Sequence, residues 1–290
     1  MVRLQGRMAF PLGPAYIWRM KDTAPDWFET CIGQLTANGT QRVWSVLVTI
    51  FGDLAQSGSD QISGALITAL TSLAGIKSEA TRVALHRLRK EGWIESTRVG
   101  RNSVHRLTDF GRDQSAAAAP RIYARDTNNP DTWHVLIASV SERSRKELSD
   151  LMLIGDYIPV NPSTAIAPGP VPDGLEDLLG IESSAISVPD WMRDLCGPEP
   201  LKAAYEQFWT TLQLVERHLP ANGLDDPLQT AVLRVLIVHG WRRLILRHPS
   251  LPPTFLPADW KGAECRQKVL QLLDRLPRPS LASLEAVLGD

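Results

Sequence analysis

Basic side chains gather in one segment of the chain, between residues 77 and 106. Across all 290 residues, 31 Lys and Arg stand against 32 Asp and Glu, so the net charge is −1. In this segment the basic residues are Lys77, Arg82, Arg87, Arg89, Lys90, Arg98, Arg101 and Arg106, and the acidic ones are Glu79, Glu91 and Glu95. The local balance is thus +5 (eight minus three). A focused cationic surface on a near-neutral chain is what phosphate contacts require.

Three helices are predicted to position this charge. Apolar residues recur with helical spacing from residue 42 to just before Gly58. Ser63 can cap a second helix that closes at Gly75. A third helix spans 78–90, with Ala84, Leu85 and Leu88 facing inward and Gly92 as its stop.

A β-hairpin is predicted to follow the helices. Strand patterns at 93–99 and 103–107 flank a turn at 100–102, and Thr108 can cap a helix that stops at Pro120. Three helices and a hairpin predict a winged helix-turn-helix, whose third helix enters the major groove. The alternative is a small α+β packing module that never meets DNA.

The third helix supplies candidate DNA contacts. We expect Lys77, Ser78, Thr81, Arg82, His86 and Arg87 on the DNA-binding surface. Arg82 can read a guanine edge bidentately or clamp a phosphate without reading sequence. His86 can contact a base or lie on a solvated face. Lys77 and Arg87, like Arg89 and Lys90, suit phosphates or solvent.

The hairpin tip supplies the remaining candidates. Arg98, Arg101 and Asn102 can reach the minor groove or the backbone, and Gly100 permits the tight turn. Arg101 is the leading residue here, with an exposed tip charge as its alternative.

The fold class predicted for the whole chain is α+β. A strand at 133–140, a helix from Ser141 to Gly155, and short strands at 157–160 and 163–166 predict a ferredoxin-like module. A connector with one short helix is expected at 168–190, and helices at 201–219, 227–246 and 261–276. The predicted organisation is an extension (1–40) with a short helix near 27–35, a winged-helix domain (41–119), a ferredoxin-like middle domain (120–180) and a mostly helical C-terminal domain (181–290).

Composition argues against several other classes. Cys31, Cys196 and Cys265 lie far apart, which fits a reducing cytoplasm and forms no zinc cluster with histidine. The longest strongly apolar run, 43–51, is too short to cross a bilayer. The chain has no G-x-G-x-x-G, P-loop or G-x-S-x-G motif, so we expect no catalytic residue, cofactor or metal, and no enzyme.

Three stretches carry a resemblance to a known family. The first holds Ile50-Phe51-Gly52-Asp53, Ile62-Ser63-Gly64, Gly92-Trp93-Ile94 and Arg106-Leu107-Thr108; the second is Arg121-Ile122-Tyr123 ahead of Trp133; the third is Trp241-Arg242-Arg243-Leu244-Ile245-Leu246-Arg247 followed by Leu256-Pro257-Ala258-Asp259-Trp260 and Gly262. Over about residues 41–275 the chain resembles the PaaX-like transcriptional repressors, which are named for control of phenylacetate catabolism.

This resemblance implies a cytoplasmic, homodimeric repressor that binds double-stranded operator DNA and is released by an aryl-acyl-CoA such as phenylacetyl-CoA. It also implies a middle domain similar to the CRISPR adaptation nuclease, where an acidic residue follows the first strand. Here Ala138-Ser139-Val140-Ser141 occupies that place, with no carboxylate until Glu142. A working nuclease is therefore not expected.

The third stretch suggests where an effector would bind. Arg242, Arg243 and Arg247 suit the phosphates of a CoA moiety, and Trp241 can stack on an adenine or aryl ring. The alternative is domain packing through Trp241 with salt bridges from the arginines.

Three other functions stay open. The first is a transcriptional regulator, either a repressor or an activator, that responds to a different effector and uses the same DNA contacts. A winged-helix protein–protein adaptor predicts binding that is insensitive to salt. A metal-dependent nuclease predicts magnesium-dependent cleavage that is lost when Glu142, Asp150 or Asp156 is substituted.

Overall fold

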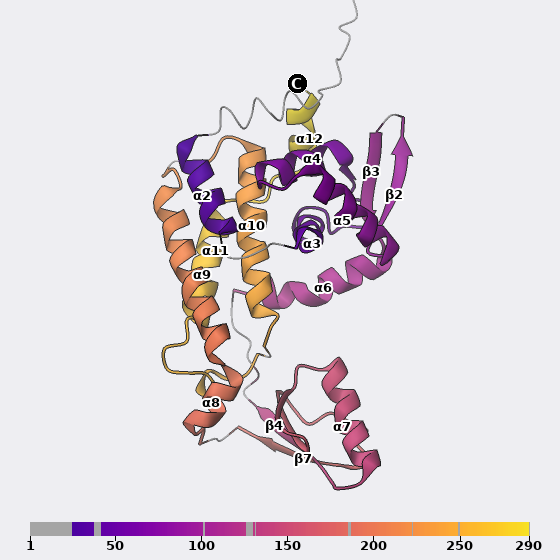
Figure 1. Cartoon of the computed structure of the whole chain (residues 1–290), viewed down its shortest axis with the longest axis vertical. Helices are drawn as coiled ribbons and strands as arrows, with labels where there is room; N and C mark the ends of the chain where they lie inside the picture. The colour runs from indigo at the N-terminus through magenta and orange to yellow at the C-terminus, as the bar shows by residue number, and fades with distance from the viewer. Residues whose placement is uncertain are drawn as a thin grey trace, which may run out of the picture. The chain divides into compact units, whose positions relative to one another are not determined.

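The chain forms two compact units of mixed helix and sheet (Figure 1). The computed structural model describes residues 25–37, 42–100, 102–125, 130, 132–184, 187–221, 223–248 and 250–289. Unit 1 comprises Met1–Tyr123, Thr210–Trp241 and Lys268–Asp290, and unit 2 comprises Ala124–Trp209 and Arg242–Gln267. Both sheets are small and antiparallel, which confirms the α+β class.

Unit 1 contains the three predicted helices in the predicted places. These are α3 (Val43–Leu54), α4 (Gly64–Leu73) and α5 (Ser78–Lys90). The Ser63 hydroxyl caps α4 by accepting a hydrogen bond from the Leu66 backbone N–H at 3.0 Å. Gly92 has a φ of 73°, the left-handed conformation that lets the chain leave α5 sharply. α3 is buried along most of its length because apolar residues cover several of its faces.

The predicted hairpin follows as β2 (Ile94–Val99) and β3 (Asn102–Leu107). They pair in register from Ile94 opposite Leu107 to Val99 opposite Asn102. A two-residue strand, β1 (Ile62–Ser63), pairs with the other edge of β3, so the sheet order is β1-β3-β2.

The helix after the hairpin runs past the predicted end. α6 spans Asp109–Tyr123, with Pro120 inside its last turn, so the prediction that it stops at Pro120 was wrong. A proline removes one backbone donor and disfavours helix, but contacts from elsewhere in unit 1 hold this turn. The Tyr123 hydroxyl donates to Asp53 at 2.7 Å, and the Trp241 indole N–H donates to the Ile122 carbonyl at 3.0 Å.

Helices also make up the rest of unit 1. The predicted short helix near residues 27–35 is confirmed as α2 (Asp26–Thr36), and the three predicted C-terminal helices are α9 (Glu199–His218), α10 (Pro227–Ile245) and α11 (Gly262–Arg275). Only residues 210–218 of α9, 227–241 of α10 and 268–275 of α11 belong to unit 1, and the rest of these helices belongs to unit 2. A further helix, α12 (Leu281–Gly289), was not predicted. α2 packs on α9, where the buried thiol of Cys31 lies 3.9 Å from the Val215 carbonyl.

Unit 2 is built on a four-stranded sheet. Its strands are β4 (Trp133–Ala138), β5 (Ile158–Asn161), β6 (Thr164–Pro168) and β7 (Leu178–Ser183), in the order β5-β6-β4-β7. All neighbouring strands are antiparallel.

Helices cover both faces of this sheet. On one face α7 (Glu142–Ile154), capped by Ser141, buries Leu136 and Ala165. On the other face α8 (Asp190–Cys196) and the short 3-10 helix η1 (Pro253–Phe255) pack on Ile158 and Ile166.

The predicted connector at 168–190 contains a strand instead of a short helix. β7 pairs with β4 over six residue pairs, and within the described part of 168–189 no helix forms. The prolines, glycines and acidic residues around β7 are typical of a loop and gave no strand signal. The strand forms through its backbone pairing with β4, which a local sequence pattern does not reveal.

Candidate nucleic-acid interface

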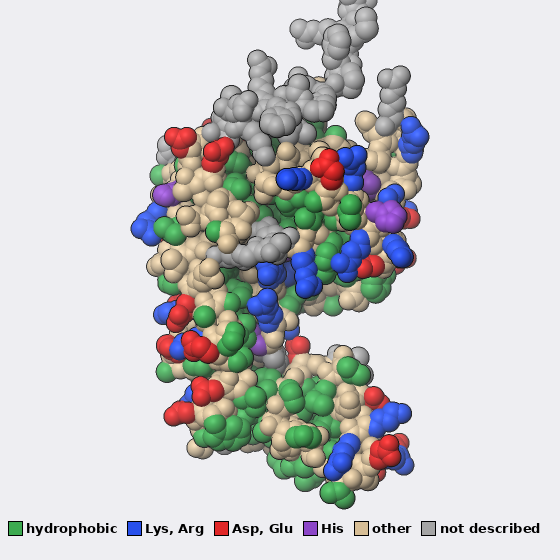
Figure 2. All heavy atoms as spheres, in the orientation of Figure 1, with side chains coloured by type: hydrophobic (Ala, Val, Ile, Leu, Met, Phe, Trp, Pro, Cys, Tyr) green, Lys and Arg blue, Asp and Glu red, His purple; other side chains and the backbone are tan. Residues whose placement is uncertain are grey.

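The basic segment lies on the surface of unit 1, on α5 and the β2–β3 hairpin. Lys77, Ser78, Arg82, His86 and Arg87 are all exposed, as the sequence predicts. Figure 2 shows Lys and Arg side chains, with Asp and Glu side chains between them, on the face that carries these elements. The helix and hairpin thus present one cationic surface.

Each acidic residue of the segment pairs with one arginine. Arg82 lies 3.4 Å from Glu79, Arg87 lies 2.7 Å from Glu91, and Arg106 lies 2.5 Å from Glu95. These pairs are exposed, so water and salt screen them and they contribute little to stability. An arginine in such a pair can exchange its carboxylate for a phosphate at low cost.

Four cations of the segment have no such partner. Within the described residues, no carboxylate lies within ion-pair distance of Lys77, Arg89, Lys90 or Arg98, and all four are exposed. Unpaired cations repel one another on a free protein and are stabilised when a polyanion neutralises them. These four cations are therefore available to a polyanion without breaking an ion pair first.

Arg87 is held more firmly than its neighbours on α5. Its guanidinium lies 5.0 Å from the centre of the Trp44 ring on α3, in addition to its pair with Glu91. A cation over an aromatic face is attracted by the ring quadrupole. Arg87 therefore has a fixed position beside α3, a contact that the sequence did not indicate.

The hairpin tip carries exposed polar side chains. Arg98 and Asn102 are exposed, and the Arg98 guanidinium donates to the Gly100 carbonyl at 3.3 Å. Gly100 has a φ of 63°, which confirms its predicted role in the turn. Arg101, the leading candidate of the hairpin, lies outside the described residues.

Thr81 does not lie on the exposed face of α5. Only 2% of its surface is exposed, and its hydroxyl donates to the Thr71 hydroxyl at 3.1 Å. This bond joins α5 to α4 inside the three-helix core. The placement of Thr81 near a DNA groove is therefore not compatible with its burial.

Val83 is an exposed residue of α5 that the sequence did not indicate as part of this surface. Its surface is 70% exposed, the largest exposure of an apolar side chain on α5. It lies between Arg82 and the inward-facing Ala84 in sequence. The inward-facing residues Ala84 and Leu88 fix the rotation of α5, and this rotation places Val83 on the solvent-exposed side of the helix.

The C-terminal basic cluster is less accessible than predicted. Trp241 is fully buried, and its indole N–H bonds to the Ile122 carbonyl, so the ring offers no face to a ligand. Its surroundings match the packing interpretation. Arg242 and Arg243 are half-buried, and only Arg247 is exposed.

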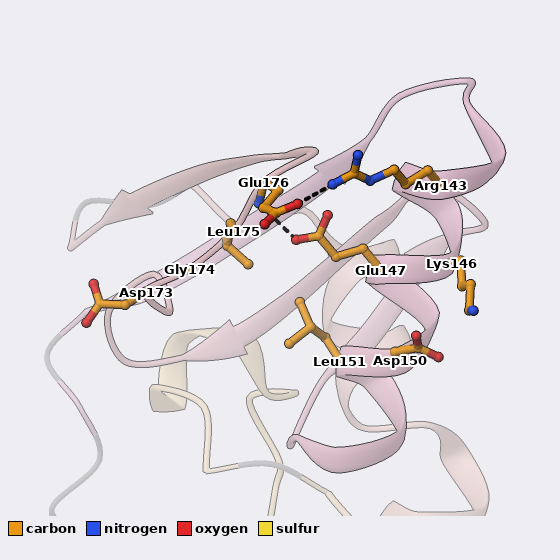
Figure 3. Close-up of a pocket in the computed structure, with 9 residues that line it drawn as sticks. All are labelled: Arg143, Lys146, Glu147, Asp150, Leu151, Asp173, Gly174, Leu175 and Glu176. Carbon is orange, nitrogen blue, oxygen red and sulfur yellow. Dashed lines mark hydrogen bonds and ion pairs between the residues drawn. The ribbon is translucent and has the colours of Figure 1, made fainter.

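Unit 2 contains a hollow of about 470 Å³ between α7 and the segment before β7 (Figure 3). Four carboxylates line it (Glu147, Asp150, Asp173 and Glu176), against two cations, Arg143 and Lys146. Arg143 pairs with Glu176, and Glu147 accepts from the backbone N–H groups of Glu176 and Asp177 at 3.1 and 3.0 Å. This excess of negative charge disfavours phosphate groups.

The residues of the nuclease alternative do not form a metal site. Asp150 lines the hollow, whereas Glu142 and Asp156 do not. Across the described parts of both units, no three His, Cys, Asp or Glu side chains come together as metal ligands. No helix in these parts has the length and apolar content to cross a bilayer.

Comparison with known proteins identifies the family. The sequence model described as "PaaX-like protein" matches residues 42–111, which hold α3 to α5 and the hairpin. The model described as "PaaX-like protein C-terminal domain" matches residues 198–286, and together the two cover more than half of the chain. The chain belongs to the PaaX-like family. The resemblance found in the sequence motifs is thereby confirmed.

One curated relative of this PaaX-like chain is the "Transcriptional repressor PaaX" of Escherichia coli (strain K12). The two are 26% identical over 257 residues, which cover 82% of this chain and 81% of the relative. Among solved structures, "Uncharacterized protein Rv0674 from Mycobacterium tuberculosis" aligns with a TM-score of 0.48 and 20% identity, over 83% of this chain and 97% of that one.

Proposed function

We propose that this PaaX-like chain is a cytoplasmic, DNA-binding transcriptional repressor whose winged helix-turn-helix lies at residues 42–111. The observation that carries the proposal is the unpaired cationic surface of α5 and the hairpin. In a winged helix α5 is the recognition helix and β2–β3 is the wing. The order of α3, α4 and α5, with the hairpin after them, supports this assignment.

Lys77, Arg89, Lys90 and Arg98 would then neutralise DNA phosphates. Each phosphate contact releases condensed counterions, so the binding constant falls with salt by a slope of about 0.9 per contact. Four contacts per module predict a log–log slope of about −3.6 for each bound module. Arg82 and His86 are exposed on the same helix and supply polar groups for base edges.

The repressor would act as a homodimer on double-stranded operator DNA. Two copies related by a two-fold axis present two recognition helices to two half-sites.

The sheet of unit 2 has the antiparallel strand order of a ferredoxin-like module, in which residues 169–177 replace the second helix. We propose this fold for the middle part of the chain.

An aryl-acyl-CoA such as phenylacetyl-CoA is the proposed effector. Binding outside the winged helix would favour a state in which the two recognition helices no longer match the half-site spacing. A coupling free energy of about 1–3 kcal/mol is enough. Arg247 is the exposed member of the C-terminal basic cluster and is the residue to test first, since Trp241 is buried.

Fluorescence anisotropy tests the proposal directly. The full chain is titrated with DNA from the region upstream of its own gene and with a scrambled duplex, at two salt concentrations, with and without phenylacetyl-CoA. We expect salt-sensitive, sequence-preferring binding that the thioester weakens. Equal binding to both duplexes, or binding that salt does not affect, would instead support the protein–protein adaptor. DNA binding that is unchanged by phenylacetyl-CoA would overturn the effector assignment only.

An Arg247→Ala variant separates the effector site from the DNA site. Its DNA binding in the absence of thioester should equal that of the unsubstituted chain. We expect a higher thioester concentration to be needed for release, because a cation that suits the CoA phosphates is gone. An unchanged release curve would exclude Arg247 from the effector site.

A further inference from the structure

Val83 points away from the core of unit 1. The buried residues of α5 are Thr81, Ala84 and Leu88. Because an α-helix turns by about 100° per residue, Val83 lies roughly 140–160° around the axis from Thr81 and Leu88. Its 70% exposure agrees with this position on the outermost line of the helix.

The exposed neighbours of Val83 on this outer face are all polar or charged, and the half-buried Ala80 lies at its edge. At the same rotation, Glu79, His86 and Lys90 lie within roughly 60° of Val83, and all three are exposed. Val83 is thus a lone exposed apolar side chain at the centre of the outer face of α5. Arg82 lies on the flank of this face, roughly 100° from Val83, whereas Leu85 lies roughly 160° away on the inward side.

Neither helix stability nor packing explains a valine at this position. Valine has a lower helix propensity than the Glu, Arg and Lys residues that fill most of the other exposed positions of α5. At 70% exposure the side chain also gains little from burial in unit 1. A single valine among charged residues offers too small an apolar area to dock a protein segment.

The major groove of DNA contains one apolar group that suits this side chain. Each thymine places its C5-methyl group in the groove, whereas the other edges present hydrogen-bond donors and acceptors. We propose that Val83 contacts the C5-methyl group of a thymine and makes this chain prefer thymine at that position. The inference rests on the proposed function, since it assigns α5 to the major groove.

Uracil replacement tests this contact at the level of one methyl group. A preferred duplex is first selected from a random pool by the full chain, and each thymine is then replaced in turn by deoxyuridine. We expect the replacement to weaken binding of the unsubstituted chain about fourfold at one or more positions, as the loss of one buried methyl predicts. In Val83→Ala the contrast between thymine and uracil should disappear at those positions.

Val99→Ala is the matched control. Val99 is also a large exposed apolar residue of this surface, at 61%, but it lies on β2 rather than on α5. The control should keep the full contrast at the positions where Val83→Ala loses it. Alanine favours helix more than valine, so Val83→Ala should fold normally, which its thermal unfolding checks.

The outcomes separate this inference from the proposed function. If no thymine shows a contrast, or if Val83→Ala keeps every contrast, DNA recognition stands and the Val83 contact is wrong. If the selection yields no duplex that binds better than scrambled DNA, the proposed function and the Val83 contact both fall. A contrast that is lost in Val83→Ala and kept in Val99→Ala supports both.

Discussion

Asp53 on α3 and Arg234 on α10 form a bidentate ion pair in the core of unit 1. The Arg234 Nε lies 2.8 Å from one carboxylate oxygen of Asp53 and its Nη2 lies 3.0 Å from the other. The Asp53 side chain is only 1% exposed and that of Arg234 11%. The pair joins the two segments that match the PaaX-like family, since Asp53 belongs to the first and Arg234 to the second.

Further bonds satisfy the rest of this buried site. The Tyr123 hydroxyl donates to Asp53 at 2.7 Å, and Arg234 also donates to the Leu276 carbonyl at 3.0 Å. Burial, followed by the Asp53 carboxylate, raises the pKa of Tyr123, so its hydroxyl stays a donor. Such a satisfied network fixes the geometry of α3, and α3 in turn carries Trp44 beneath Arg87.

Loss of Asp53 should strongly destabilise the protein. Asp53→Ala leaves the Arg234 guanidinium buried without its counter-charge, which costs about 3–5 kcal/mol. The free energy of unfolding from urea titration measures this. Glu79→Ala, which removes an exposed pair, is the control and should leave the urea midpoint almost unchanged. Equal midpoints for Asp53→Ala and the unsubstituted chain would show that the buried pair contributes nothing.

Glu285 on α12 hydrogen-bonds to Ser63, the residue that caps the start of α4. Its carboxylate accepts from the Ser63 backbone N–H at 3.0 Å and from the Ser63 hydroxyl at 2.9 Å, while that hydroxyl caps α4. Glu285→Ala should cost about 1–2 kcal/mol of stability through the weakened cap. Glu285→Gln keeps one acceptor oxygen and should lose less, so thermal unfolding should rank the three proteins. An Ala variant as stable as the unsubstituted chain would contradict this role.

The sequence predicted the local elements of unit 1 well and its long-range contacts not at all. Ser63, Gly92 and Gly100 act within a few residues of themselves, so caps and turns follow from the sequence. Asp53 and Arg234 are 181 residues apart, and no local pattern joins them. The extension of α6 through Pro120 likewise depends on Asp53 and Trp241, both distant in sequence.

The residues of the candidate site were predicted only in part, because the prediction did not follow the rotation of α5 at every position. Choosing Ala84 and Leu88 as inward positions already places Thr81 inward, because it precedes them by three and seven residues. It also places Val83 outward. The prediction of Thr81 near the groove was therefore incompatible with the rotation that Ala84 and Leu88 define. β7 escaped prediction because an edge strand of mixed composition is defined mainly by its partner, β4.

Thr81 should prove structural when it is substituted. Thr81→Val keeps the shape of the side chain and removes its bond to Thr71, so we expect about 1 kcal/mol less stability. DNA affinity should stay within about twofold, because the residue is buried. Anisotropy with the preferred duplex measures this. A tenfold loss of affinity in a fully folded Thr81→Val protein would instead restore Thr81 to the interface.

Arg89 and Lys90 should act on the salt dependence of binding. Replacing both by alanine removes two exposed, unpaired cations. If both contact phosphates, the log–log salt slope should become less steep by about 1.8, with a similar loss of affinity for preferred and scrambled DNA. Lys146→Ala, an exposed lysine of unit 2, is the control and should leave the slope unchanged. An unchanged slope in the double variant would exclude these two residues as phosphate contacts.

His105 should make the hairpin sensitive to acid. It is buried on β3, with Nδ1 2.7 Å from the Ser96 hydroxyl on β2. Burial, followed by the positive charge of Arg89, lowers its pKa below the usual 6.5. The fold therefore holds the neutral ring, whereas the unfolded chain takes up a proton as soon as the pH falls below about 6.5.

Because the unfolded chain takes up a proton at His105 before the folded chain does, acid should destabilise the fold. The contribution of His105 to stability is complete above pH 6.5 and is lost as the pH falls through the pKa of the folded state. The urea midpoint should accordingly fall between pH 7.5 and 5.5, and His105→Gln should reduce that fall. His86→Gln, on the exposed face of α5, should respond to pH like the unsubstituted chain. If His105→Gln and His86→Gln lose the same stability over this range, the buried imidazole is not the group that titrates, and the acid sensitivity of the hairpin has another source.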